Sequence, residues 1–214
     1  MPKLFAKARE PFSSYSHFIG AVLSGAGLLA MLIHIGLCGA SVRTAVSVMV
    51  FGLSLIGLYT ASSVYHFSLR SEQIIRRLKK IDHSMIYVLI AGSYTPVLLK
   101  FMAAPRSIYF TIAIWAVALF GITVKLLWID APRMIGTALY LVLGWAIMVD
   151  FGTILRMPAP AVALLAAGGI CYTLGGIVYI VKKPNIGIGF HELFHLFVIG
   201  GSAFHFLMVF LYVL

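Results

Sequence analysis

Long runs of apolar residues, separated by short polar segments, recur along the whole chain. Each run contains at least 18 residues, which is enough for an α-helix to cross the ~30 Å hydrocarbon core of a bilayer. Seven runs meet this length, at about 17–38, 44–67, 82–102, 107–128, 134–155, 160–181 and 190–213. The pattern predicts an all-α membrane protein, a bundle of seven transmembrane helices. Because the connections are short, we expect a single domain that covers residues 1–214.

The composition excludes an ordinary soluble domain. Hydrophobic residues make up 62% of the chain and charged residues 10%, and the mean hydropathy is +1.04. The first apolar run follows a basic leader, but it is about twice as long as the apolar region of a secretory signal peptide, so we interpret it as a span. The formal net charge of +10 lies in the segments between spans. Lipid headgroups and topology account for it there, so we expect no nucleic-acid partner.

The distribution of basic residues predicts the orientation of the bundle. The N-terminus and the even-numbered loops hold twelve Lys and Arg residues, whereas the opposite side holds four: Arg43, Lys100, Arg106 and Arg156. Positively charged loops remain in the cytoplasm. We therefore expect a cytoplasmic N-terminus and, after an odd number of spans, a C-terminus outside.

Five polar side chains from three spans are predicted to lie at one membrane depth. His66 stands at the cytoplasmic end of the second span, and Ser62 lies one turn deeper on the same helical face. Asp82 begins the third span on that side. His191 and His195 begin the seventh span there and, four positions apart, share one helical face. Ionisable side chains in a membrane bundle are costly, so this coincidence indicates a functional site.

The residue types at this depth favour a zinc site. Three neutral imidazoles with an open position for water are the ligand set of a catalytic zinc, which lowers the pKa of the bound water to ~7. We predict His66, His191 and His195 as metal ligands. Asp82 would orient the water or take its proton, or would instead fix a histidine tautomer, and Ser62 would support it. The alternative is a set of separate interfacial histidines, each bonded to backbone or lipid phosphate.

The string HELFH that begins at His191 also fits the zinc-protease pattern H-E-x-x-H. In that pattern the glutamate, here Glu192, is the general base. No second motif supplies an acidic third ligand at the matching depth apart from Asp82, and His66 fills the third place more naturally. We therefore interpret Glu192 as incidental and rank a protease low.

Four other ionisable residues of the spans are interpreted one by one. His17 begins the first span on the cytoplasmic side, where headgroup contact is favoured over contact with the site. His83 points about 100° away from Asp82 on a helix and is interpreted as interfacial. His205 is expected to be a hydrogen-bonded core histidine. Asp150, towards the outer end of the fifth span, is expected to contact an arginine of an outer loop.

Together these motifs resemble a known family. Four strings carry the resemblance: S-x-x-x-H at 62–66, KIDHSMIY at 80–87, IAGSYTP at 90–96 and H-x-x-x-H at 191–195. They resemble the haemolysin III branch of the progestin and adipoQ receptor (PAQR) family, which is related to the adiponectin receptors and, more distantly, to alkaline ceramidases. The match covers nearly the whole chain, and the absence of a long N-terminal domain is typical of bacterial members.

The resemblance implies seven helices, a cytoplasmic N-terminus and a zinc ion held by His66, His191 and His195. It also implies that Asp82 contacts the zinc-bound water and that Ser62 lies behind the ligands. For the related receptors and ceramidases the implied activity is hydrolysis of a lipid amide. For the bacterial branch the resemblance implies a role in membrane-lipid or fluidity homeostasis, in the cytoplasmic (inner) membrane as a multi-pass protein.

Two positions depart from the family pattern. The family often has an Asn four residues before the histidine of the first span, where this chain has Ser13, although Glu10 keeps the expected spacing to His17. The family does not require an acidic residue at the position of Glu192.

Three functions of different classes follow. The first is a zinc-dependent hydrolase of a lipid amide, with membrane lipids as partners and a lipid amide or fatty acid as ligand. The second is a non-enzymatic lipid or fluidity sensor, or receptor, in which zinc is structural. The third is a pore-forming haemolysin, for which seven mostly apolar helices offer no evident polar channel lining. The first is the leading hypothesis.

Overall fold

The computed structural model describes residues 2–184 and 187–214, which form helices and no strands. Asn185 and Ile186, in the loop expected before the seventh span, lie outside the described residues. The described residues include seven helical segments that are long and apolar enough to cross a membrane. The predicted all-helical bundle with seven spans is therefore confirmed.

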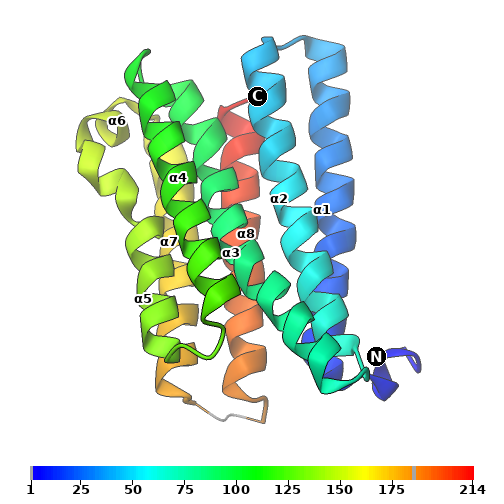
Figure 1. The fold of residues 1–214 in the computed structure, drawn as a ribbon. Helices are drawn as coiled ribbons and strands as arrows, with labels where there is room; N and C mark the ends of the chain where they lie inside the picture. Colours follow the sequence, from blue (N-terminus) through cyan, green and yellow to red (C-terminus); the bar gives the residue numbers. More distant parts are fainter. Residues whose placement is uncertain (1, 185–186) are drawn as a thin grey trace.

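The helices run up and down beside one another, and the two termini lie at opposite ends of the bundle (Figure 1). The segments are α1 (Pro11–Cys38), α2 (Val42–Phe67), α3 (Glu72–Phe101), α4 (Arg106–Leu127), a fifth segment over Arg133–Arg156, α7 (Ala159–Val181) and α8 (Phe190–Tyr212). A short 3-10 helix, η1 (Phe5–Lys7), precedes α1. In sequence-adjacent pairs, α1 packs on α2, α2 on α3, α3 on α4, and α7 on α8, while α8 also contacts α1.

Helix α3 begins earlier than its apolar run. The sequence predicted a third span that begins at residue 82, but residues 72–81 already belong to the helix as its first turns. Glu72 lies in the first turn, where a negative charge interacts favourably with the exposed N–H groups of a helix start. The basic residues of this stretch are therefore carried on a helix.

The fifth span is interrupted, although the sequence predicted one continuous helix over 134–155. It consists of α5 (Arg133–Gly144), the 3-10 helix η2 (Ala146–Asp150) and α6 (Phe151–Arg156). The break follows Gly144, a residue that disfavours the helical conformation.

A tyrosine from another helix satisfies the backbone groups at this break. The hydroxyl of Tyr94, on α3, donates to the carbonyl oxygen of Gly144 at 2.7 Å and accepts from the N–H of Ile147 at 2.9 Å. In a membrane, backbone groups that leave the helical pattern need such partners because no water replaces them. The interruption therefore depends on a contact between residues that are distant in sequence.

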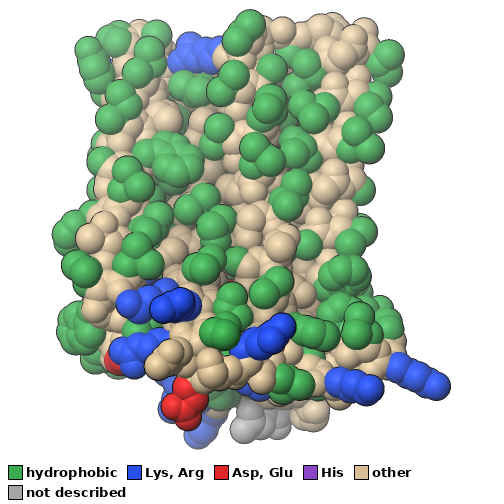
Figure 2. All heavy atoms as spheres, turned by 45° about the vertical axis from the view of Figure 1, so that its right-hand side comes forward, with side chains coloured by type: hydrophobic (Ala, Val, Ile, Leu, Met, Phe, Trp, Pro, Cys, Tyr) green, Lys and Arg blue, Asp and Glu red, His purple; other side chains and the backbone are tan. Residues whose placement is uncertain are grey.

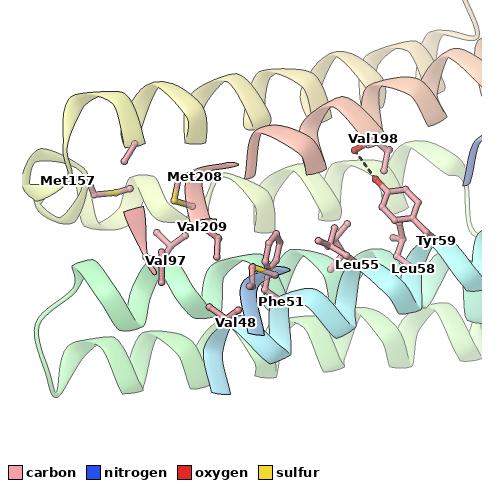
Figure 3. Packing of buried hydrophobic residues seen from close by; sticks show 14 residues of the cluster. Val48, Phe51, Leu55, Leu58, Tyr59, Val97, Met157, Val198, Met208 and Val209 are labelled. Carbon is pink, nitrogen blue, oxygen red and sulfur yellow. Dashed lines mark hydrogen bonds between the residues drawn. The ribbon is translucent and has the colours of Figure 1, made fainter. Parts of the chain in front are cut away.

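The centre of the bundle is a close-packed apolar cluster between α2, α3 and α8 (Figure 3). Phe51 and Leu55 of α2 are packed with Val209 of α8, and all three are nearly inaccessible to solvent. Closer to the end of the bundle that holds the N-terminus, the hydroxyl of Tyr59 on α2 donates a hydrogen bond to the hydroxyl of Ser202 on α8 at 2.8 Å. Close packing and such interhelical hydrogen bonds hold membrane helices together, because lipid removes much of the hydrophobic driving force.

The outer surface matches a membrane environment. Figure 2 shows hydrophobic side chains over the flank of the bundle, with most of the visible Lys and Arg side chains gathered at the end that holds the N-terminus in Figure 1. At the opposite end, Asp150 pairs with Arg106 at 3.0 Å, as expected from the sequence. The direction of the bundle across the membrane stays a prediction.

The Tyr94→Phe variant is expected to lower the thermal stability of the purified protein in detergent. Loss of the hydroxyl leaves two backbone groups of the break without their partner, which costs about 1–3 kcal/mol. The matched control is Tyr109→Phe, since Tyr109 is 68% exposed. Melting curves of the two variants and the wild type test the prediction, and equal melting temperatures for the two variants would contradict it.

Candidate metal centre

Three histidines from two helices meet at the end of the bundle that holds the N-terminus. His66 lies in the last turn of α2, and His191 and His195 lie in the first two turns of α8. One ring nitrogen from each lies within 4.8 Å of the others. Helix α2 ends where α8 begins, and the four-residue spacing on α8 directs both of its imidazoles towards α2.

The spacing and chemistry of these groups fit a zinc ion. The Nε2 atoms of His66 and His191 are 3.4 Å apart. Two nitrogens bound tetrahedrally to one zinc at ~2.0–2.1 Å lie about 3.3 Å from each other. Three imidazoles form a donor set that suits zinc, and His66 and His195 are each only 2% exposed. A metal of this kind would be shielded from bulk water on most sides.

Glu10, just before α1, contacts the far side of His66. Its Oε2 atom lies 2.8 Å from Nδ1 of His66. The hydrogen bond with His66 holds the pKa of the Glu10 carboxyl below its usual value, although partial burial acts in the opposite direction. Sequence reasoning noted only the spacing of Glu10 to His17. The contact with His66 depends on how the N-terminal segment folds against α2, and no local pattern reports that.

The structure brings Asp82 and Ser62 to the same place. Both residues, with His191 and His195, line a small hollow of about 50 Å³ beside the histidines. The Asp82 side chain, on α3, is 13% exposed, and Ser62 of α2 is buried. Four of the five residues predicted to share one depth thus line one space, and the fifth, His66, lies beside it in the histidine cluster. Their roles as ligands or catalytic groups stay predictions.

His17 lies inside the site, so the interpretation as a headgroup contact is wrong. It is 3% exposed, and its ring stacks on that of His195 with centroids 3.8 Å apart. Neither ring nitrogen has a hydrogen-bond partner among the described residues. The reason is lateral packing: α1 lies close against α2, where Gly20 of α1 leaves room for the ring of Tyr59.

His83 also differs from its interfacial interpretation. Its Nδ1 atom lies 3.3 Å from Oδ2 of Asp82, its side chain is 17% exposed, and it lines the same small hollow. A helical wheel places neighbouring Cα atoms about 100° apart, but the His83 ring is oriented so that one nitrogen approaches the Asp82 carboxylate. His83 therefore belongs to the surroundings of Asp82.

The composition of the cluster bears on Glu192, and the contacts of His205 bear on its predicted role. Among the described residues, the group that could hold a metal consists of His66, His191 and His195 and contains no carboxylate. The protease interpretation of Glu192 thus gains no support. His205 has its Nε2 atom 3.2 Å from the carbonyl oxygen of Leu165, as expected of a hydrogen-bonded core histidine.

A larger apolar cavity adjoins the small hollow. It has a volume of about 320 Å³ and lies between α3, the interrupted fifth span, α7 and α8. The two spaces share six lining residues: Leu58, Ile86, Thr137, Tyr140, Phe194 and Val198. Gly144 and Ile147, at the break in the fifth span, belong to the wall of the larger cavity. The polar site therefore borders a space of suitable character for an apolar chain.

Comparisons with known proteins find a matching family model and several similar proteins. A family model described as haemolysin-III related matches residues 5–206. The chain is 34% identical over 206 residues to Hemolysin-3 of Bacillus cereus, which covers 96% of this chain and 92% of that protein. It is 36% identical over 211 residues to the Hemolysin-3 homolog of Bacillus subtilis (strain 168), with 98% and 96% covered. Monocyte to macrophage differentiation factor of Homo sapiens is 25% identical over 171 residues, with 78% and 70% covered.

The purified wild-type protein is expected to bind about one zinc ion per chain. Replacement of His66, His191 or His195 by Ala removes one of three ligands, so the affinity for zinc should fall by about 100-fold or more. This is a larger loss than the ~10–100-fold that follows removal of a residue hydrogen-bonded to a ligand. His34→Ala is the control, because His34 lies near the far end of α1. Elemental analysis and competition with a chelator provide the measurement. Unchanged zinc content in all three variants would refute the metal centre.

Proposed function

This chain belongs to the haemolysin III-related family, and from that membership and its three-histidine cluster we propose that it is a zinc-dependent hydrolase that cleaves an amide bond in a membrane lipid. The family match agrees with the resemblance recognised in the motifs. One observation carries the proposal: His191 and His195 of the cluster and Asp82 border a small hollow that shares its wall with a larger apolar cavity. Through this activity the protein would influence lipid composition and membrane fluidity.

The larger cavity supports a lipid as the ligand. Its volume of about 320 Å³ lies at the lower end of the range for ligand pockets. Its lining is almost wholly apolar, with Phe194 and Val198 next to the polar hollow. An acyl chain placed in this cavity would bring its polar end, a carbonyl group, towards the histidines.

Each residue of the site would have a separate role in the hydrolysis. His66, His191 and His195 would hold the metal through neutral imidazole nitrogens. A bound zinc ion supplies a Lewis acid for the carbonyl and lowers the pKa of a water molecule in the site. The Asp82 carboxylate, in the hollow with His191 and His195, would accept a proton from that water and pass it to the leaving amine. Ser62 would support the carboxylate, and the apolar wall would exclude bulk water.

Hydrolysis by the zinc-loaded protein in detergent tests this proposal. We expect fatty acid release from a lipid amide such as a short-chain ceramide, detected by mass spectrometry. Asp82→Asn should keep the bound zinc and reduce the rate by about 10²–10⁴-fold, the usual contribution of a general base. Asp130→Asn is the matched control, because the side chain of Asp130 is 59% exposed and pairs with Arg76.

Two results would contradict the hydrolase. One is the absence of fatty acid release from a panel of lipid amides by protein that carries stoichiometric zinc. The other is full activity in the Asp82→Asn variant. Retained zinc with no hydrolysis would favour the sensor, in which the metal has a structural role.

We further propose that the protein lies in the bacterial cytoplasmic membrane with the metal centre at the cytoplasmic side. The support is the excess of Lys and Arg at the end of the bundle that holds the histidines. Zinc would then reach the site from the cytoplasm.

A cysteine-labelling experiment tests this orientation. Cys38 is exposed and ends α1 at the end opposite the metal centre, whereas Cys171 is partly buried within α7. In spheroplasts of a Cys171→Ser strain, a membrane-impermeant maleimide is expected to label Cys38. A cysteine introduced at Ser71, at the other end of the bundle, should react only after permeabilisation. The reverse pattern would overturn the orientation.

A further inference from the structure

The segment that precedes α1 is bound to the end of α2 at the metal centre. The backbone N–H of Glu10 donates to the carbonyl oxygen of His66 at 3.0 Å. The side chain of the same residue places Oε2 2.8 Å from Nδ1 of His66. One residue thus contacts both the backbone and the ring of a predicted ligand. These two bonds fix the ring relative to the end of its helix.

Neighbouring contacts hold Glu10 in this position. Arg9 places Nη2 3.2 Å from the other carboxylate oxygen, Oε1. The guanidinium group of Arg9 also lies over the ring of Tyr65, 4.4 Å from its centroid. Both carboxylate oxygens of Glu10 are therefore engaged, and the side chain has little freedom to leave His66.

A second pair of bonds joins α1 and α2 one turn further into the bundle. The hydroxyl of Ser14 donates to the carbonyl oxygen of Ser63 at 3.0 Å, and the hydroxyl of Ser63 donates to the carbonyl oxygen of Ser14 at 2.9 Å. These bonds do not involve the Glu10 side chain. Removal of the Glu10 carboxylate should therefore leave α1 in place on α2.

The contact between Glu10 and His66 determines which ring nitrogen faces the other histidines. An ionised carboxylate only accepts hydrogen bonds, so Nδ1 of His66 must carry the hydrogen. A neutral imidazole then has its lone pair on Nε2. That atom lies 3.4 Å from Nε2 of His191, on the side of the cluster.

We infer that Glu10 is a positioning residue that fixes His66 in the Nδ1–H tautomer, with Nε2 directed to the metal. The inference rests on the proposed metal centre for its purpose, although the effect on His66 itself does not require a metal. Glu10 acts through His66, because the group of potential ligand atoms consists of His66, His191 and His195 within the described residues. Partners of this kind orient the ligands of metal sites and raise their basicity.

The first measurement is zinc affinity. Glu10→Ala is expected to reduce the affinity of the full-length protein for zinc by about 10–100-fold, the usual effect of losing such a partner. Glu192→Ala is the matched control. Glu192 follows His191 in the sequence, but its carboxylate is not part of the histidine cluster. This variant should leave the affinity unchanged. Glu10→Gln, whose amide oxygen can still accept from Nδ1–H, should lie between wild type and Glu10→Ala.

The second measurement uses metal-free protein and is independent of zinc. With ¹⁵N-labelled histidine, nuclear magnetic resonance distinguishes Nδ1–H from Nε2–H tautomers. The signal of His66, assigned by its loss in His66→Ala, should show Nδ1–H in the wild type and in Glu192→Ala. In Glu10→Ala it should change towards Nε2–H or an exchanging mixture, whereas Glu10→Gln should keep Nδ1–H. A residue that merely stabilised the fold would not alter the tautomer of a folded variant.

The two measurements separate this inference from the proposed function. If the wild type binds no zinc but the tautomer still depends on Glu10, the metal centre fails and the positioning of His66 stands. If Glu10→Ala keeps the Nδ1–H tautomer, Glu10 does not position His66 and the inference is overturned. If zinc binds and the tautomer changes while zinc affinity stays at the wild-type value, the claim that Glu10 prepares His66 for the metal is overturned.

Discussion

The cost of placing ionisable side chains inside a membrane bundle governs the organisation of this protein. An imidazole or carboxylate that leaves water must find a partner, and lipid provides none in the hydrocarbon region. Here several of these groups are gathered at one end, where His66, His191 and His195 lie together and Asp82 borders the hollow that His191 and His195 line. A metal ion would satisfy the three ring nitrogens together. The rest of the bundle serves to hold this arrangement with apolar packing and a few interhelical hydrogen bonds.

The interrupted fifth span connects the polar site to an apolar space. The residues around Gly144 and Ile147 leave the regular helical pattern, and the hydroxyl of Tyr94 satisfies the backbone groups that are freed. The same stretch lines the larger cavity, which shares its wall with the hollow at Asp82. Irregular backbone within a membrane is tolerated where it is buried in protein or lines a cavity. The break and the cavity are thus two aspects of one structural feature.

Two residues near the N-terminus, Glu10 before α1 and His17 within it, complete the site. Glu10 contacts His66 through both its backbone and its carboxylate, and His17 on the following helix stacks on His195. Two of the three predicted ligands are therefore contacted by residues near the N-terminus: His66 by Glu10 and His195 by His17. A chain that was trimmed before α1 would keep its spans and lose part of this support.

The order of apolar runs by itself determined the seven spans, because a helix needs a fixed length to cross hydrocarbon. That order also placed His66, Asp82, His191 and His195 at one depth, since depth follows from position within a span. The sequence could not place residues around the bundle axis. The stacking of His17 on His195 and the bond of Glu10 to His66 were decided by lateral packing, which couples residues far apart in the chain. The contact of His83 with Asp82 was decided by the side-chain conformation of His83. The break in the fifth span was likewise decided by a tyrosine from another helix, whose hydroxyl supplied the bonds that the local backbone had lost.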